Sequence, residues 1–161
     1  MAIFNVKDYG ALGNGLTNDT LAIGRAVAAA SAAGGGQVYL PEGTYILSGS
    51  GNVRGPILRL ADNVSLIGDG AGISTLKLGN HAAGTTALIE TDTRTNIGLS
   101  NLTLDGNRDN NSGTVVGWYN SDATGVRIDG VEVKNFSGAG LRLTGTTGLN
   151  QRDIEVSNSS F

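Results

Sequence analysis

Short runs in which apolar and polar residues alternate make up much of the second half of the chain. Four of them share one style, in which alternating apolar residues are closed by Gly or Asn: residues 63–70, 96–106, 125–136 and 152–161. Alternation with a period of two predicts β-strands, each with one buried and one outward face.

The runs also repeat along the chain. Three apolar pairs recur at intervals of roughly 20 to 30 residues: Leu102/Leu104, Val131/Val133 and Ile154/Val156. Repeats of this length, built from strands and turns without a helix, are typical of a solenoid whose coils bury their inner sides on their neighbours. The sequence therefore predicts an all-β fold, a parallel β-helix.

The alternation also predicts the direction of each side chain in the later repeats. We expect six apolar residues to point inward: Val126, Ile128, Val131, Val133, Leu141 and Leu143. We expect the residues between them to point outward: Arg127, Asp129, Glu132, Lys134, Arg142 and Thr144. Asn135 and Asn158 each follow an inward Val by two residues, which favours an amide ladder at a turn.

The N-terminal part has a different pattern. Ile23, Val27 and Ala30 have helical spacing within residues 19–33, Asn18 or Asp19 can cap the start, and Gly34 to Gly36 provide a stop. Strands are expected at 37–39 and 44–47, with a turn at 41–43. We predict one domain, 1–161, with an N-terminal cap over about 1–36 and coils over about 37–161.

The two ends of the predicted solenoid differ. The helix is placed to cover the N-terminal end, whereas no comparable segment follows the last repeat, so we expect an uncapped C-terminal coil. A second copy of the chain, making a homo-oligomer, or a missing C-terminal continuation would cover that coil.

Composition narrows the function. The 161 residues include 26 Gly, 2 Pro, one His and no Cys, and the net charge is −3. This excludes disulfides, thiolate metal sites and His-rich metal sites, and the lack of a basic cluster argues against nucleic acid. We see no apolar run near the roughly 20 residues of a membrane span and no signal peptide.

Two stretches resemble known families. Residues 4–49 (FNVKDYGALGNG… to …GTYILSG) resemble the opening of the pectate-lyase superfamily of right-handed β-helices. Residues 99–120 (LSNLTLDGNRDNNSGTVVGWYN) are similar to a stretch in the catalytic A-modules of bacterial mannuronan C5-epimerases. The resemblance implies a right-handed fold, a chain shorter than half of such a module, alginate as substrate class, and secretion.

The motif that performs the chemistry in these epimerases is Tyr-Gly-Phe-Asp-Pro-His, directly after Ser-Gly. Here Ser137-Gly138 is followed by AGLRLTG, which puts Ala139, Arg142 and Thr144 at the Tyr, Asp and His positions. Arg142 can pair with a uronate carboxylate, but neither Ala nor Thr can act as a base. The module is therefore expected to be non-catalytic, and either structural or a binder of acidic polysaccharide.

Two other functions stay open. One is an active epimerase or polysaccharide lyase, completed by an oligomeric partner or by missing C-terminal coils. The other is a phage tailspike-like or engineered oligomeric β-helix.

The candidate substrate-binding residues are three cations and two aromatic residues: Arg127, Lys134, Arg142, Trp118 and Tyr119. Aromatic faces beside a row of cations suit an acidic polysaccharide. The alternative for Trp118 is that it packs the preceding loop against the solenoid wall.

Asp105, Asn107 and Asp109 alternate in the loop after one strand. An EF-hand is excluded, because the sixth and twelfth positions counted from Asp105 hold Asn110 and Val116 instead of Gly and Glu. The oxygen-rich set suits Ca²⁺, and it equally suits an Asx-type turn. His81, in a Gly- and Ala-rich loop, is expected to be a surface residue.

Overall fold

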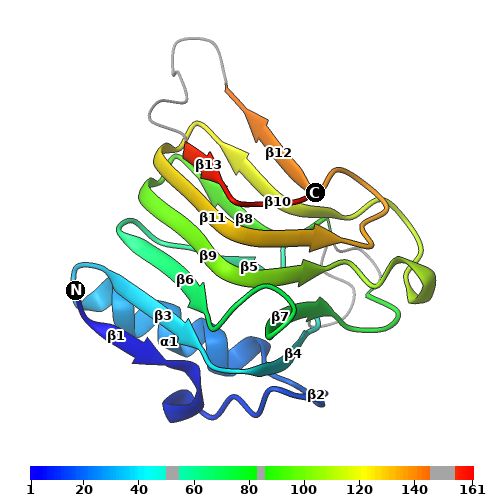
Figure 1. The fold of residues 1–161 in the computed structure, drawn as a ribbon, viewed down its shortest axis with the longest axis horizontal. Helices are drawn as coiled ribbons and strands as arrows, with labels where there is room; N and C mark the ends of the chain where they lie inside the picture. Colours follow the sequence, from blue (N-terminus) through cyan, green and yellow to red (C-terminus); the bar gives the residue numbers. More distant parts are fainter. Residues whose placement is uncertain (50–54, 83–85, 146–154) are drawn as a thin grey trace.

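The computed structural model describes residues 1–49, 55–82, 86–145 and 155–161, and shows strands stacked in successive coils (Figure 1). The N-terminal coils contain β1 (Ile3–Asn5), η1 (Val6–Tyr9), β2 (Asn14–Asn18), α1 (Thr20–Ala32), β3 (Gly36–Leu40), β4 (Gly43–Leu47) and β5 (Leu58–Arg59). The later coils contain β6 (Val64–Gly68), β7 (Ser74–Leu78), β8 (Ala87–Asp92), β9 (Thr95–Asp105), η2 (Arg108–Asn110), β10 (Val116–Ser121), β11 (Thr124–Lys134), β12 (Leu141–Thr144) and β13 (Glu155–Ser157).

Every pairing between these strands is parallel. The strands form three faces. Face one contains β1, β3, β6, the first halves of β9 and β11, and β13. Face two contains β2, β4, β7 and the second halves of β9 and β11, and face three contains β5, β8, β10 and β12. The predicted parallel β-helix is confirmed.

A sharp corner separates face one from face two. Asn101 and Gly130 form it in adjacent coils, with φ of 53° and 62°. Gly adopts this left-handed conformation because it has no Cβ to clash with the backbone, and Asn tolerates it because its short polar side chain can hydrogen-bond locally. The corner residue also resets the alternation, so that Ile128 before it and Val131 after it both point inward.

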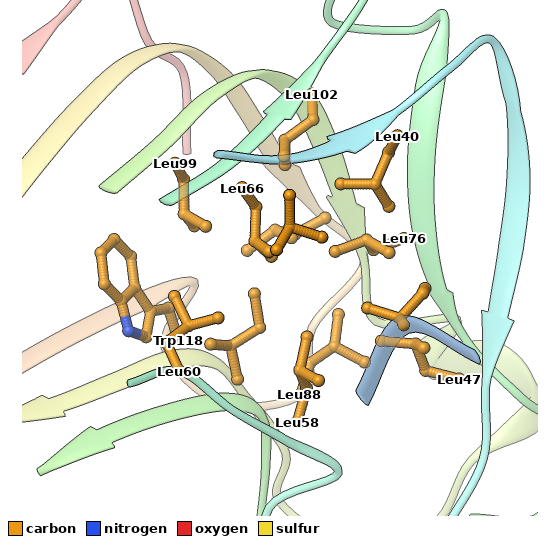
Figure 2. Packing of buried hydrophobic residues seen from close by; sticks show 14 of the residues in the cluster. Leu40, Leu47, Leu58, Leu60, Leu66, Leu76, Leu88, Leu99, Leu102 and Trp118 are labelled. Carbon is orange, nitrogen blue, oxygen red and sulfur yellow. The ribbon is translucent and has the colours of Figure 1, made fainter. Parts of the chain in front are cut away.

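The core fills the space enclosed by the three faces (Figure 2). Val126, Ile128, Val131 and Val133 are buried as predicted, while Leu141 and Leu143 are half-buried. Arg127, Asp129, Lys134 and Arg142 are exposed, and Glu132 and Thr144 are half-buried. Of the third apolar pair, Ile154 lies outside the described residues and Val156 is exposed instead of buried.

The predicted helix is present as α1, and its apolar residues Ile23, Val27 and Ala30 are buried. It packs on β1, β3 and η1, at the N-terminal end of the stack (Figure 1). Asn18 Oδ1 accepts the Thr20 N–H at 3.1 Å, and so satisfies a free donor of the first turn. The buried Asp19 carboxylate instead accepts backbone N–H groups from the loop before β2.

The predicted amide ladder of Asn135 and Asn158 is wrong. Each donates from Nδ2 to a carboxylate of the preceding coil: Asn135 to Asp105 at 3.1 Å, and Asn158 to Asp129 at 2.9 Å. An amide pair joins adjacent coils at another corner, where Asn96 Nδ2 donates to Asn63 Oδ1 at 3.0 Å.

Within the described part of the chain, no helix is both long enough and apolar enough to cross a membrane.

Candidate functional site

A row of polar side chains runs along the outer side of face three. The strand register places Arg59 of β5 beside Glu90 of β8, Glu90 beside Tyr119 of β10, and Tyr119 beside Arg142 of β12. Each of these residues occupies an outward position of its strand; the neighbours of Arg59, Glu90 and Tyr119 are buried, and those of Arg142 are half-buried. One residue per coil therefore contributes to a single line along the solenoid axis.

The residues in this row make contact in pairs. The guanidinium carbon of Arg142 lies 5.7 Å from the centre of the Tyr119 ring, and Thr144 Oγ1 donates to the Tyr119 hydroxyl at 3.1 Å. Further along, Arg59 Nη2 lies 3.2 Å from Glu90 Oε1. The Glu90 carboxylate therefore offsets the charge of Arg59, whereas Arg142 presents its charge over an aromatic ring.

The three positions that correspond to the epimerase Tyr, Asp and His lie at and just before β12. Arg142 and Thr144 are outward residues of β12, and Ala139 is exposed two residues before the strand. These positions therefore present a methyl group, a guanidinium and a hydroxyl. A methyl group cannot exchange a proton, and guanidinium and alkyl hydroxyl groups do not lose one near neutral pH.

Arg127 and Lys134 do not join this row. Arg127 lies on face one, where its Nη1 is 3.8 Å from Glu155 Oε2. Lys134 lies on face two, and its Nζ donates to Glu132 Oε2 at 2.9 Å. Hydrogen bonds from Lys134 and Thr103 lower the pKa of the Glu132 carboxyl. The prediction of one cationic row is wrong, because the corner at Gly130 turns the two halves of β11 onto different faces.

Trp118 lies in the core instead of on the surface. Only 1% of its surface is exposed, and its Nε1 donates to Thr91 Oγ1 at 2.9 Å (Figure 2). Trp118 points inward because it is one residue from the outward Tyr119 on the same strand. The prediction that Trp118 stacks on a sugar is wrong. The indole has a packing role, but it lies in the core of the coil and not between the preceding loop and the solenoid wall.

The loop that contains Asp105, Asn107 and Asp109 forms a hydrogen-bonded turn. Asp105 Oδ1 accepts the Asn107 N–H at 2.8 Å, which is the bond of an Asx turn. Asp109 points away, with 93% of its side chain exposed. Among the described residues no group of three or more His, Cys, Asp or Glu side chains is placed to hold a metal ion. Calcium binding through these carboxylate and amide oxygens stays a prediction.

Asn107 joins this loop to the loop of the preceding coil. Its Nδ2 donates to Leu78 O at 3.0 Å and to Asn80 Oδ1 at 2.8 Å, and its Oδ1 accepts from Asn110 at 2.8 Å. Asn111 adds bonds to Gly79 O and to the N–H of Ala82. The exposed His81 donates its backbone N–H to Asn110 O at 3.1 Å.

Ser137, just before the motif positions, holds the other end of the same loop. Its hydroxyl accepts the Val115 N–H at 2.9 Å and donates to Gly113 O at 2.7 Å. The segment that leads into β10 is thus attached to the coils on both sides. Sequence reasoning missed Ser137, Arg59 and Glu90; the last two follow from alternation once the strands are aligned in register.

A family model for rhamnogalacturonase A/epimerase, pectate lyase-like proteins matches residues 3–160. The chain belongs to this family. It is 45% identical over 151 residues to mannuronan C5-epimerase AlgE1 of Azotobacter vinelandii, covering 87% of this chain and 11% of AlgE1. It is 38% identical over 145 residues to alginate lyase 7 of the same organism, covering 83% of this chain and 17% of that protein.

The similarity extends to three dimensions. The A-module of the Azotobacter vinelandii mannuronan C-5 epimerase AlgE6 superposes with a TM-score of 0.81 at 37% identity. The match covers 97% of this chain and 47% of that module. The predicted resemblance to epimerase A-modules and the right-handed parallel β-helix are confirmed, and the chain spans about half the length of the module it matches.

Proposed function

We propose that this chain is an epimerase-like β-helix module that binds an acidic polysaccharide such as alginate without converting it. The observation that carries the proposal is the Arg142–Tyr119 pair, in which Arg142 stands at a position that the sequence resemblance assigns to the epimerase motif. A guanidinium binds a carboxylate through two parallel hydrogen bonds, and the ring beneath it holds the guanidinium plane in place. Relatives named as mannuronan epimerases and an alginate lyase support alginate as the ligand.

The expected lack of conversion follows from what C5 epimerisation demands. The uronate carboxylate must be neutralised, a base must remove the C5 proton, and an acid must return one to the other side. Arg142 can neutralise the carboxylate. Ala139 and Thr144 supply neither base nor acid, so the residues at the motif positions support binding alone.

One observation favours conversion as a second candidate function. The Arg142 guanidinium lies over the Tyr119 ring, whose hydroxyl accepts from Thr144, so a sugar bound to Arg142 would lie close to a group able to exchange a proton. An active epimerase or lyase would use this hydroxyl in place of the motif residues. Secretion, which the resemblance implies, is likewise proposed for this chain.

Alginate binding is tested by native gel electrophoresis in gels that contain sodium alginate. We expect the alginate to retard the protein, and Arg142→Ala to weaken binding about tenfold, the loss of one charge-assisted contact. Arg25→Ala is the matched control, because Arg25 is exposed on α1 and its replacement changes the net charge equally. Equal weakening by both variants would show a general charge effect and contradict a site at Arg142.

Conversion is tested on the same protein with polymannuronate. The proposal expects no guluronate by NMR and no absorbance from unsaturated uronate ends. Either product would show catalysis, and its loss in Tyr119→Phe would assign the reaction to the Tyr119 hydroxyl. Persistence of the product in Tyr119→Phe would place the reaction elsewhere in the chain.

A further inference from the structure

A groove lined by both polar and apolar residues runs across the outside of face one, away from Arg142. It consists of two adjoining cavities of about 550 and 450 Å³, which share Ser65, Arg127 and Glu155 among their lining residues. Face one contains β3, β6, β9, β11 and β13, which lie side by side in successive coils (Figure 1). Apart from Met1, the lining residues come from these strands, so the groove crosses successive coils. Its length therefore follows the solenoid axis.

Small residues in the middle coils shape the groove. The register aligns Gln37, Ser65, Gly98, Arg127 and Glu155 in one outward column. Ser65 and Gly98 form a low floor between the longer side chains of Gln37 and Arg127. A Cβ added at Gly98 would lie 3.1 Å from both Ser65 Oγ and Arg127 O, so the floor at this point has little room for a larger residue.

Beside apolar residues such as Met1, Ile97 and Leu99, several hydrogen-bonding groups line the groove. Hydroxyls come from Ser65, Ser100 and Ser157, an amide from Gln37, a guanidinium from Arg127, and carboxylates from Asp129 and Glu155. The Arg127 and Glu155 side chains are 80% and 64% exposed, so both remain accessible beyond their mutual contact. Neighbouring donors and acceptors of this kind match the paired hydroxyls of a sugar.

The charges of the residues that line the groove indicate which class of polymer it can bind. Two carboxylates, Asp129 and Glu155, are balanced by the guanidinium of Arg127 and the N-terminal ammonium of Met1, which also lines the groove, so the groove has no excess of positive charge. A polyuronate or a nucleic acid is attracted by such an excess, and the groove does not supply one. A peptide added as a strand needs an open sheet edge, but the middle strands of face one are paired on both sides.

We propose that this groove binds an uncharged polysaccharide, with its chain along the solenoid axis. Parallel strands are about 4.8 Å apart, a spacing comparable to one sugar unit of an extended chain, so successive sugars meet successive coils. Face one is separated from face three, so the proposal does not depend on alginate binding at Arg142.

The test uses native gels that contain hydroxyethylcellulose, galactomannan or dextran, with alginate gels in parallel. We expect at least one neutral polymer to retard the protein. Ser65→Tyr fills the floor above Gly98 and should weaken that binding at least about tenfold. Thr75→Tyr is the matched control: Thr75 is an equally half-buried outward residue on β7 of face two and should leave binding unchanged.

Arg127→Ala provides a second variant that does not disturb folding, since the Arg127 side chain is largely exposed. Arg127→Ala should also weaken binding of the neutral polymer. Three results would overturn the proposal: no retardation by any of the three neutral polymers, unchanged binding in both Ser65→Tyr and Arg127→Ala, or an equal loss in Thr75→Tyr. The proposal would also be overturned if alginate retards the original protein but not the Ser65→Tyr variant, because the groove would then bind the acidic polymer.

Discussion

Trp118 and Tyr119 are adjacent in β10 and have opposite environments. The Trp118 indole is buried and hydrogen-bonded to Thr91, whereas the Tyr119 ring is half-buried beneath the Arg142 guanidinium. A strand sends successive side chains to opposite sides, so a pair of neighbouring aromatic residues cannot form one sugar-binding platform on it. At the scale of the residue, alternation decides which ring stabilises the coil and which is available to a ligand.

Replacing Trp118 by Ala should destabilise the protein by about 3–5 kcal/mol, because the side chain leaves a cavity in the centre of the core. Chemical denaturation followed by circular dichroism measures the free energy of unfolding. Tyr119→Phe, which removes one hydroxyl, should change it by about 1 kcal/mol or less. A Trp118→Ala variant as stable as Tyr119→Phe would contradict the buried position of the indole.

The loop between β9 and β10 shows how an irregular element is held in place. Asn107 has φ of 46° and is 8% exposed, so it combines a left-handed backbone with a buried amide. Asn tolerates this backbone, and its side chain satisfies the carbonyl of Leu78 in the preceding coil. The same loop is attached to the following coil through Ser137. The asparagine-rich segment is thus a structural connection between coils.

Asn107→Ala should cost about 2–4 kcal/mol of unfolding free energy, because it leaves the buried Leu78 carbonyl unpaired and strains the left-handed backbone. Asn107→Gly removes the same bonds without the strain and should lose less. Asp109→Ala, on the exposed side of the loop, should stay within about 0.5 kcal/mol. Denaturant titrations of the three variants measure these differences, and an equal loss in all three would contradict the assigned role of Asn107.

At the scale of the whole molecule, carboxylates connect one coil to the next. Glu132 accepts from Thr103 of the preceding coil, and Asp129 accepts from Ser157 and Asn158 of the following coil. The pKa of the Glu132 carboxyl is lowered from its ordinary 4.5 by hydrogen bonds from Lys134 and then Thr103, and that of Asp129 from its ordinary 3.8 by those from Asn158 and Ser157. In the last described coil, the apolar residues Val156 and Phe161 are exposed, with 46% and 62% of their surfaces accessible. Oligomerisation at this end of the stack stays a prediction.

The lowered pKa values predict a pH dependence of stability. A carboxyl whose pKa is lower in the folded state stabilises the fold above its unfolded pKa, and that contribution disappears as pH falls through the folded pKa. The double variant Asp129→Asn/Glu132→Gln should therefore melt below the original protein at pH 7. The gap in melting temperature should close as pH falls below 3.8. An equal gap in melting temperature at pH 7 and below pH 3.8 would contradict a stabilising role for the charged forms of the Asp129 and Glu132 carboxyls.

Much of the fold was predictable because its signals are local. The alternation of Val126, Ile128, Val131 and Val133, the helical spacing of Ile23 and Val27, and the glycines after α1 each act within a few residues. Part of the site was predictable for the same reason: Arg142 and Tyr119 are outward residues of their strands. Their contact was not, because it depends on the register between β10 and β12.

Periodicity and turn chemistry along single stretches of chain predicted several of the strands, the capping helix and the repeat, and hence the solenoid. Which outward residues share a face could be read only from the folded structure. One corner residue, Gly130, turns Arg127 and Lys134 of the same strand onto different faces, and the register brings Arg142 onto Tyr119 instead. The physical reason is that neighbours on a solenoid face come from successive coils, so the positions of the corners set them.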